Sequence, residues 1–132
     1  MSNVYALIIE DNVISSEVLR ELLSSESVVC SAIQDPRIVP EYMRKQTPPD
    51  IIFLDLEMPY VDGYEVLDLL KADPDWSPVP VVAYTVHVSE LQNARKKAFH
   101  SFLGKPLDAD RFPGQLSQIL NGERVWDITP TT

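Results

Sequence analysis

The stretch IIFLDLEMPYVDGYE, residues 51–65, decides the fold class of this chain. It opens with an apolar run, Ile51 to Leu54, of the kind that forms a strand buried on both faces, and the run ends in Asp55. Asp62, followed by Glu65 three residues later, is typical of a capping box at the start of a helix. A buried strand followed by a helix is a βα unit, so the stretch predicts a parallel sheet.

The same alternation of short apolar runs and amphipathic stretches extends over most of the chain. Besides the run at 51–54, it predicts strands at Val4–Ile9, Val28–Ile33, Val79–Tyr84 and Ser101–Gly104. Helices are expected between them, starting near Ile14, Asp35, Asp62, Ser89 (with Gln92) and Asp110, with a final stop at Asn121-Gly122. We therefore predict an α/β domain with a five-stranded parallel sheet and helices on both faces.

The composition restricts the classes of protein to which this chain can belong. The chain has 132 residues, 20 acidic side chains against 11 Lys plus Arg, a net charge of −9 and one cysteine. These values exclude an intrachain disulfide and argue against binding to nucleic acid, and no apolar run reaches the roughly 18 residues of a membrane helix. We expect a cytoplasmic protein with one domain at residues 1–122 and a short tail at 123–132, which would leave no room for an output domain.

Three carboxylates are expected to meet at one edge of the sheet. Glu10 and Asp11 follow the first strand and Asp55 follows the third, and the carboxyl ends of parallel strands share an edge. An acidic pair alone is usually a solvated turn, but a strand holds Asp55 in place, as it would hold a nucleophile or a metal ligand. Carboxylate oxygens favour Mg²⁺ over zinc, so we predict a Mg²⁺ site.

Thr85 and Lys105, the latter followed by Pro106, come at the ends of the fourth and fifth predicted strands, at the same edge. Taken alone, Thr85 would be an ordinary strand residue and Lys105 an ordinary surface charge. Beside metal-bound carboxylates, a hydroxyl and an ammonium group suit a transferring phosphoryl group.

With these residues in view, the chain resembles the receiver domains of bacterial two-component response regulators, of the chemotaxis-regulator type. Residues 55–65 are similar to the family signature D-x-x-M-P-x-x-D-G-x-E, and the spacing of the acidic pair, the central Asp, the Thr and the Lys-Pro also matches. The resemblance covers about residues 4–121. It implies a flavodoxin-like (βα)5 fold with strand order 2-1-3-4-5 and a role in phosphorelay signal transduction.

The resemblance also implies a role for each site residue. Asp55 would accept a phosphoryl group from a sensor histidine kinase or a histidine phosphotransfer protein, and Thr85 and Lys105 would contact the phosphoryl oxygens. Mg²⁺ would be held by Glu10, Asp11, Asp55 and the backbone carbonyl of Glu57; further expectations are a cis peptide before Pro106 and an aromatic switch at Phe102. Such a protein catalyses only its own phosphorylation and dephosphorylation, and signals by contact with a downstream protein that the sequence does not identify.

Some positions depart from the family pattern. Val86 stands where many receivers have a small residue, which predicts slow turnover of the phosphoryl group, and the short interval from Thr85 to Lys105 predicts an abbreviated fourth helix. His87 is expected to face solvent, and Trp126 to lie in the tail. The main alternative is a receiver-like adaptor that docks partners without phosphorylation. A phosphatase of the haloacid dehalogenase type is disfavoured, because such enzymes typically carry a second Asp where this chain has Glu57.

Overall fold

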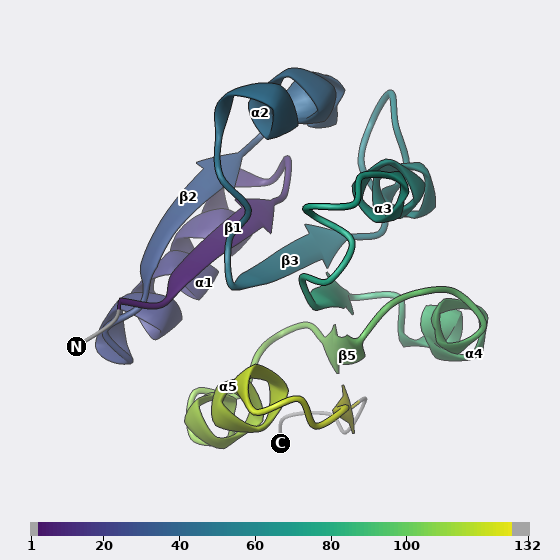
Figure 1. Cartoon of the computed structure of the whole chain (residues 1–132). Helices are drawn as coiled ribbons and strands as arrows, with labels where there is room; N and C mark the ends of the chain where they lie inside the picture. Colours follow the sequence, from purple (N-terminus) through teal and green to yellow (C-terminus); the bar gives the residue numbers. More distant parts are fainter. Residues whose placement is uncertain (1–2, 128–132) are drawn as a thin grey trace.

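The computed structural model describes residues 3–127 of the chain, in which strands and helices alternate (Figure 1). The strands are β1 (Tyr5–Ile9), β2 (Val29–Ile33), β3 (Ile51–Asp55), β4 (Val81–Thr85), β5 (Ser101–Gly104) and β6 (Trp126–Asp127). The helices are α1 (Val13–Ser25), α2 (Val39–Lys45), α3 (Gly63–Ala72), α4 (Leu91–Arg95) and α5 (Phe112–Leu120), with 3₁₀ turns at Pro36–Ile38 and Val88–Glu90. Within residues 3–127, no helix is long and apolar enough to cross a bilayer.

All strands pair in parallel, in the order β2-β1-β3-β4-β5-β6. The predicted order of the first five strands is confirmed, and the sheet has one short strand more than the sequence predicts. Strands β3 and β4 are buried along their whole length, as their continuous apolar runs indicate.

The sheet separates two hydrophobic cores, which gives the predicted three-layer architecture (Figure 1). Side chains of α2, α3 and α4 pack with Ile52 and Leu54 on one face. Side chains of α1 and α5 pack with Ile51 and Phe53 on the other face. Because successive side chains in a strand point to opposite faces, Asp55 follows Phe53 onto the face covered by α1 and α5.

The predicted starts of the first three helices are confirmed, α1 at Val13 and the next two by the predicted caps. Asp62 accepts a hydrogen bond from the backbone N–H of Glu65 at 2.9 Å, at the start of α3. Asp35 accepts from the N–H of Arg37 at 3.0 Å, and Pro36 then opens the 3₁₀ turn before α2. In both places, a short acidic side chain satisfies a backbone donor that the helix leaves free.

The predicted starts of the fourth and fifth helices are wrong. Ser89 lies inside the 3₁₀ turn, and α4 begins after it without a side-chain cap; the helix is short, as the sequence predicts. At the start of α5, Asp108 accepts from the N–H groups of Asp110 and Arg111, at 2.8 and 3.3 Å. Asp108 therefore takes the capping role that we predicted for Asp110, because its side chain folds over the turn that precedes the helix.

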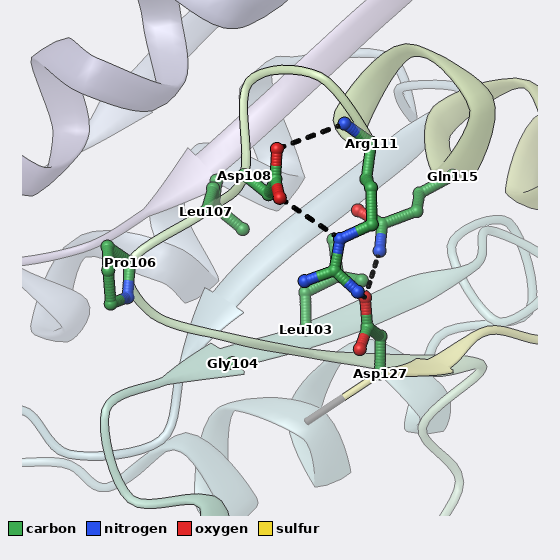
Figure 2. Close-up of a pocket in the computed structure, with 8 residues that line it drawn as sticks. All are labelled: Leu103, Gly104, Pro106, Leu107, Asp108, Arg111, Gln115 and Asp127. Atoms are coloured by element: carbon green, nitrogen blue, oxygen red, sulfur yellow. Dashed lines mark hydrogen bonds and ion pairs between the residues drawn. The ribbon is translucent and has the colours of Figure 1, made fainter. Parts of the chain in front are cut away.

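The segment that leads into β6 closes the edge of β5. The N–H of Phe102 donates to the carbonyl of Val125 at 2.8 Å. Asp127 pairs with Arg111 at 3.0 Å and accepts from the side chain of Gln115, so both contacts tie β6 to α5 (Figure 2). Residues predicted to lie in a tail thus cover an edge that would otherwise expose unpaired backbone groups.

Trp126→Ala is expected to lower the free energy of unfolding by about 1–2 kcal/mol. The Trp126 side chain is partly buried against the core, and the guanidinium of Arg95 lies 5.1 Å from the centre of a Trp126 ring. Urea denaturation of the single variants and of the Arg95→Ala/Trp126→Ala double variant measures the coupling, which we expect to be about 0.5 kcal/mol. Additive single effects would contradict a stabilising stack.

Candidate functional site

The site lies at the carboxyl edge of the sheet, where β1 and β3 end. Carboxylate oxygens of Glu10, Asp11 and Asp55, one from each residue, all lie within 4.8 Å of one another. Glu10 is fully buried and Asp55 is 7% exposed, whereas Asp11 lies closer to solvent. The structure therefore brings together the three carboxylates that the sequence places at this edge.

Lys105 supplies a positive charge at the centre of this cluster. It follows β5, and its Nζ forms a short ion pair with Glu10 Oε1 and lies 3.7 Å from Asp55 Oδ2. Only 13% of the Lys105 side chain is exposed. A largely desolvated ammonium interacts with these carboxylates much more strongly than a surface lysine would.

The cluster favours the protonated form of Asp55. Burial, together with the hydrogen bond and negative charge of Glu10, raises the pKa of Asp55 to about 7. Burial also acts to raise the pKa of Glu10, but hydrogen bonds with Asp55 and Lys105 and the charge of Lys105 outweigh it and lower the pKa. Burial and the nearby Glu10 raise the pKa of Asp11. Glu10 is therefore the ionised partner of Lys105, and of the two carboxyl groups Asp55 is the one that binds a proton more tightly.

The donor set suits a hard divalent cation. The clustered side chains offer carboxylate oxygens only, at separations that bring negative charges close together. A cation such as Mg²⁺ relieves this repulsion, and carboxylates together with water are its usual ligands. Sulfur and imidazole ligands, which zinc prefers, do not belong to the cluster.

Thr85 ends β4, and Glu57 lies in the loop that follows Asp55. The Glu57 N–H donates to Asp55 Oδ1 at 3.3 Å, and the Thr85 hydroxyl, which is almost fully buried, accepts from the N–H of His87 at 3.1 Å. His87 is half-exposed, but its Nε2 also lies 2.9 Å from a carboxylate oxygen of Glu57. This contact, which the sequence did not predict, links the loop after β3 to the loop after β4.

The other two predicted residues, Pro106 and Phe102, belong to β5 and the segment that follows it. The Lys105–Pro106 peptide bond is cis. Phe102 is fully buried and packs in the core on the α3 and α4 side of the sheet, in register with Ala83. A link between Phe102 and the carboxylates would therefore have to cross the sheet.

Comparison with known proteins identifies the family. Residues 6–117 match the model of the response regulator receiver domain. The chain is a member of the response regulator receiver domain family. The match runs from within β1 into α5 and includes every clustered side chain of the site.

Two curated response regulators are similar in sequence to this receiver domain. An uncharacterized response regulatory protein of Vibrio cholerae is 33% identical over 129 residues, which are 96% of this chain and 53% of that protein. The polar-differentiation response regulator DivK of Brucella anthropi is 26% identical over 108 residues, 80% of this chain and 87% of DivK. The receiver domain thus spans about half the length of its Vibrio relative.

A solved structure shows the same fold. It is the receiver domain of a sensor histidine kinase from Pseudomonas aeruginosa, with a magnesium ion coordinated in the active site cleft. That structure has a TM-score of 0.76 at 23% identity, covering 91% of this chain and 96% of its own. Because the sequence identity is only 23%, this similarity concerns the fold alone.

A close backbone contact explains why the receiver signature has glycine at residue 63. The Gly63 N–H donates to the carbonyl of Leu56 at 3.0 Å, so α3 begins directly against the backbone that follows Asp55. A Cβ at residue 63 would lie 2.6 Å from the Asp55 carbonyl oxygen and 2.7 Å from Leu56 Cα. Neither backbone atom can move without displacing the loop that carries Asp55, so this approach requires glycine.

Tyr84 is a residue of the receiver site that sequence reasoning missed. It pairs in register with Asp55 across β3 and β4, and Lys105 Nζ lies 4.4 Å from the centre of its ring. The signal was present, since Tyr84 is a hydroxyl-bearing residue in an apolar strand, one position before Thr85. Its relation to Asp55 depends on the register of two strands, which periodicity does not specify.

Proposed function

We propose that this receiver domain accepts a phosphoryl group on Asp55 from a phosphohistidine of a sensor histidine kinase or a histidine phosphotransfer protein. The observation that carries the proposal is the cluster itself: Asp55, two further carboxylates and one ammonium group meet at the sheet edge. The proposal also assigns Mg²⁺ to Glu10, Asp11, Asp55 and the backbone carbonyl of Glu57.

In the proposed step, a carboxylate oxygen of Asp55 attacks phosphorus and forms the O–P bond of an acyl phosphate. The P–N bond to the donor imidazole breaks, and its electron pair leaves with the imidazole. Bound Mg²⁺ would offset the negative charge of the carboxylates and of the phosphoryl oxygens. Asp55 must first lose the proton that its raised pKa retains, since only the ionised carboxylate is a nucleophile.

Lys105 and Thr85 would stabilise the product. The Lys105 ammonium, already 3.7 Å from Asp55, is within reach of a phosphoryl oxygen on that residue. Thr85 would donate its hydroxyl to another phosphoryl oxygen, which requires the hydroxyl to turn from the loop where it contacts His87. Val86, 61% exposed next to Thr85, would narrow the approach of water and slow hydrolysis of the acyl phosphate.

The signal would leave the site through β5. Movement of Thr85 toward the phosphoryl group would favour one of two packings of Phe102, and so one of two arrangements of α4, β5 and α5. A downstream protein that binds one arrangement more tightly would read the phosphorylation state. The chain would act only on its own aspartyl phosphate.

Acetyl phosphate with Mg²⁺ tests the proposal. The P–O bond to acetate breaks in this case, and intact-protein mass spectrometry should detect one added phosphoryl group, located in the peptide that contains Asp55. Asp68→Asn, which removes an exposed carboxylate on α3, is the matched control and should still be labelled. Persistent absence of label on the unmodified chain would contradict the proposal and favour an adaptor that docks without phosphorylation.

The affinity for Mg²⁺ is expected to rise with pH up to about 7 and then to level off. The cation must displace the proton held on Asp55, whose pKa is about 7, so binding at lower pH releases a proton. Isothermal titration calorimetry in two buffers of different ionisation enthalpy measures this release directly. An affinity that stays constant between about pH 5 and 8 would contradict a protonated Asp55 in the metal-free site.

A further inference from the structure

The hydroxyl group of Tyr84 is an anomaly in an otherwise well-paired structure. Tyr84 is 1% exposed, and within residues 3–127 its Oη is the buried side-chain polar atom that lacks a hydrogen-bond partner. A buried hydroxyl without a partner costs about 1–3 kcal/mol, and such groups are rare in native proteins. A buried hydroxyl donor that lacks a partner, although charged groups lie nearby, requires an explanation.

The surroundings of Tyr84 point to the phosphoryl site. Its ring packs edge to face with Phe53 at 6.3 Å between centroids, which holds it on the face of the sheet that Asp55 shares. Lys105 Nζ lies 4.4 Å from the ring centroid, within the range of a cation–π contact. Burial, followed by the charge of nearby Glu10 and the approach of its carboxylate to the hydroxyl, raises the pKa of Tyr84, so the phenol remains a neutral donor that faces Glu10.

Glu10 is the residue that will need this donor. In the present arrangement, Lys105 pairs with Glu10 Oε1, and the Asn12 N–H donates to Oε2 at 3.2 Å. A phosphoryl group on Asp55 would draw the ammonium toward its own oxygens, away from Glu10. Glu10 is fully buried, so its Oε1 would then need another hydrogen-bond donor in place of the ammonium, also with Mg²⁺ bound to the carboxylates.

We propose that Tyr84 is a positioning residue of the phosphoryl site: its ring holds the Lys105 ammonium, and its hydroxyl donates to Glu10 when Lys105 turns to the phosphoryl group. The inference rests on the proposed function of Asp55. The proposal explains why the Tyr84 hydroxyl lacks a hydrogen-bond partner in the present arrangement. Until Asp55 carries a phosphoryl group, Lys105 pairs with the Glu10 oxygen to which Tyr84 would donate.

Tyr84→Phe tests the hydroxyl without removing the ring. Thermal unfolding of the metal-free protein is compared with that of protein loaded with Mg²⁺ and beryllofluoride, a mimic of the phosphoryl group. We expect Tyr84→Phe to leave the metal-free melting temperature unchanged or slightly higher, because no hydrogen bond is lost. Its affinity for beryllofluoride should fall about tenfold, the scale of one hydrogen bond to a charged group.

Tyr42→Phe is the matched control. The Tyr42 hydroxyl is hydrogen-bonded to that of Tyr5 at 2.6 Å, at the opposite end of β1 from Glu10, so its removal should lower the metal-free melting temperature and leave the beryllofluoride affinity unchanged. A Tyr84→Phe variant that binds beryllofluoride as tightly as the unmodified chain would overturn this inference alone. A Tyr84→Phe variant with lower metal-free stability would also overturn it, since the hydroxyl would then have a structural partner such as a buried water. An unmodified chain that does not respond to beryllofluoride would overturn both the inference and the proposed function.

Discussion

Asp55→Asn is expected to abolish formation of the acyl phosphate and, at the same time, to stabilise the metal-free protein at neutral pH. The amide cannot attack phosphorus, so the first effect is complete. For the second effect, we expect the free energy of unfolding to rise by on the order of 2 kcal/mol. This value is smaller than the energy that corresponds to the full pKa difference of Asp55, because solvent at the rim of the site screens the charge.

The sign of the stability change follows from the pKa of Asp55. Its value is raised from 3.8 to about 7 in the folded protein, so the folded state binds this proton more tightly than the unfolded state. The corresponding stability is fully present below about pH 4 and is lost as the pH rises through about 7. The Asn side chain replaces the protonated carboxyl group by an amide that donates to Glu10 and does not titrate.

Urea denaturation near pH 4.5 and pH 8, without divalent cations, separates this effect from a general gain in packing. The difference between Asp55→Asn and the unmodified chain should be small at the lower pH and large at the higher one. Asp68→Asn controls for the loss of one negative charge and should show no such trend. A difference that does not depend on pH would show that Asp55 carries no shared proton.

Gly63→Val is expected to lower the free energy of unfolding by more than about 3 kcal/mol. Even the first added carbon would lie 2.6 Å from the Asp55 carbonyl oxygen, and both close neighbours are backbone atoms of the β3–α3 loop. Because the clash involves the backbone that carries Asp55, any variant that folds should also bind Mg²⁺ less tightly.

Gly114→Ala provides the matched control for Gly63→Val. Gly114 is also helical, but a Cβ added there would meet no atom within 4 Å. This variant should gain up to about 1 kcal/mol from the helix propensity of alanine. Thermal unfolding followed by circular dichroism compares the two variants, and equal melting temperatures would contradict the close approach at Gly63.

The sequence by itself determined the alternation of strands and helices, the family and the charged residues of the site. Apolar runs such as Ile51 to Leu54 specify buried strands locally, and right-handed crossovers then bring their carboxyl ends to one edge. The sequence alone therefore places Glu10, Asp11 and Asp55 at the same edge of the sheet. The cap of α3 by Asp62 was equally local, since it involves residues three positions apart.

Tertiary structure alone decided the features that depend on contacts between distant segments. Strand β6 has two residues, too few for a periodic pattern, and it is held by Phe102, Arg111 and Gln115. Tyr84 acquired its place through the register of β3 with β4 and through Lys105, which follows a different strand. Periodicity reports whether a side chain is buried, but not which charge it meets there, because that depends on the three-dimensional packing of segments far apart in the chain.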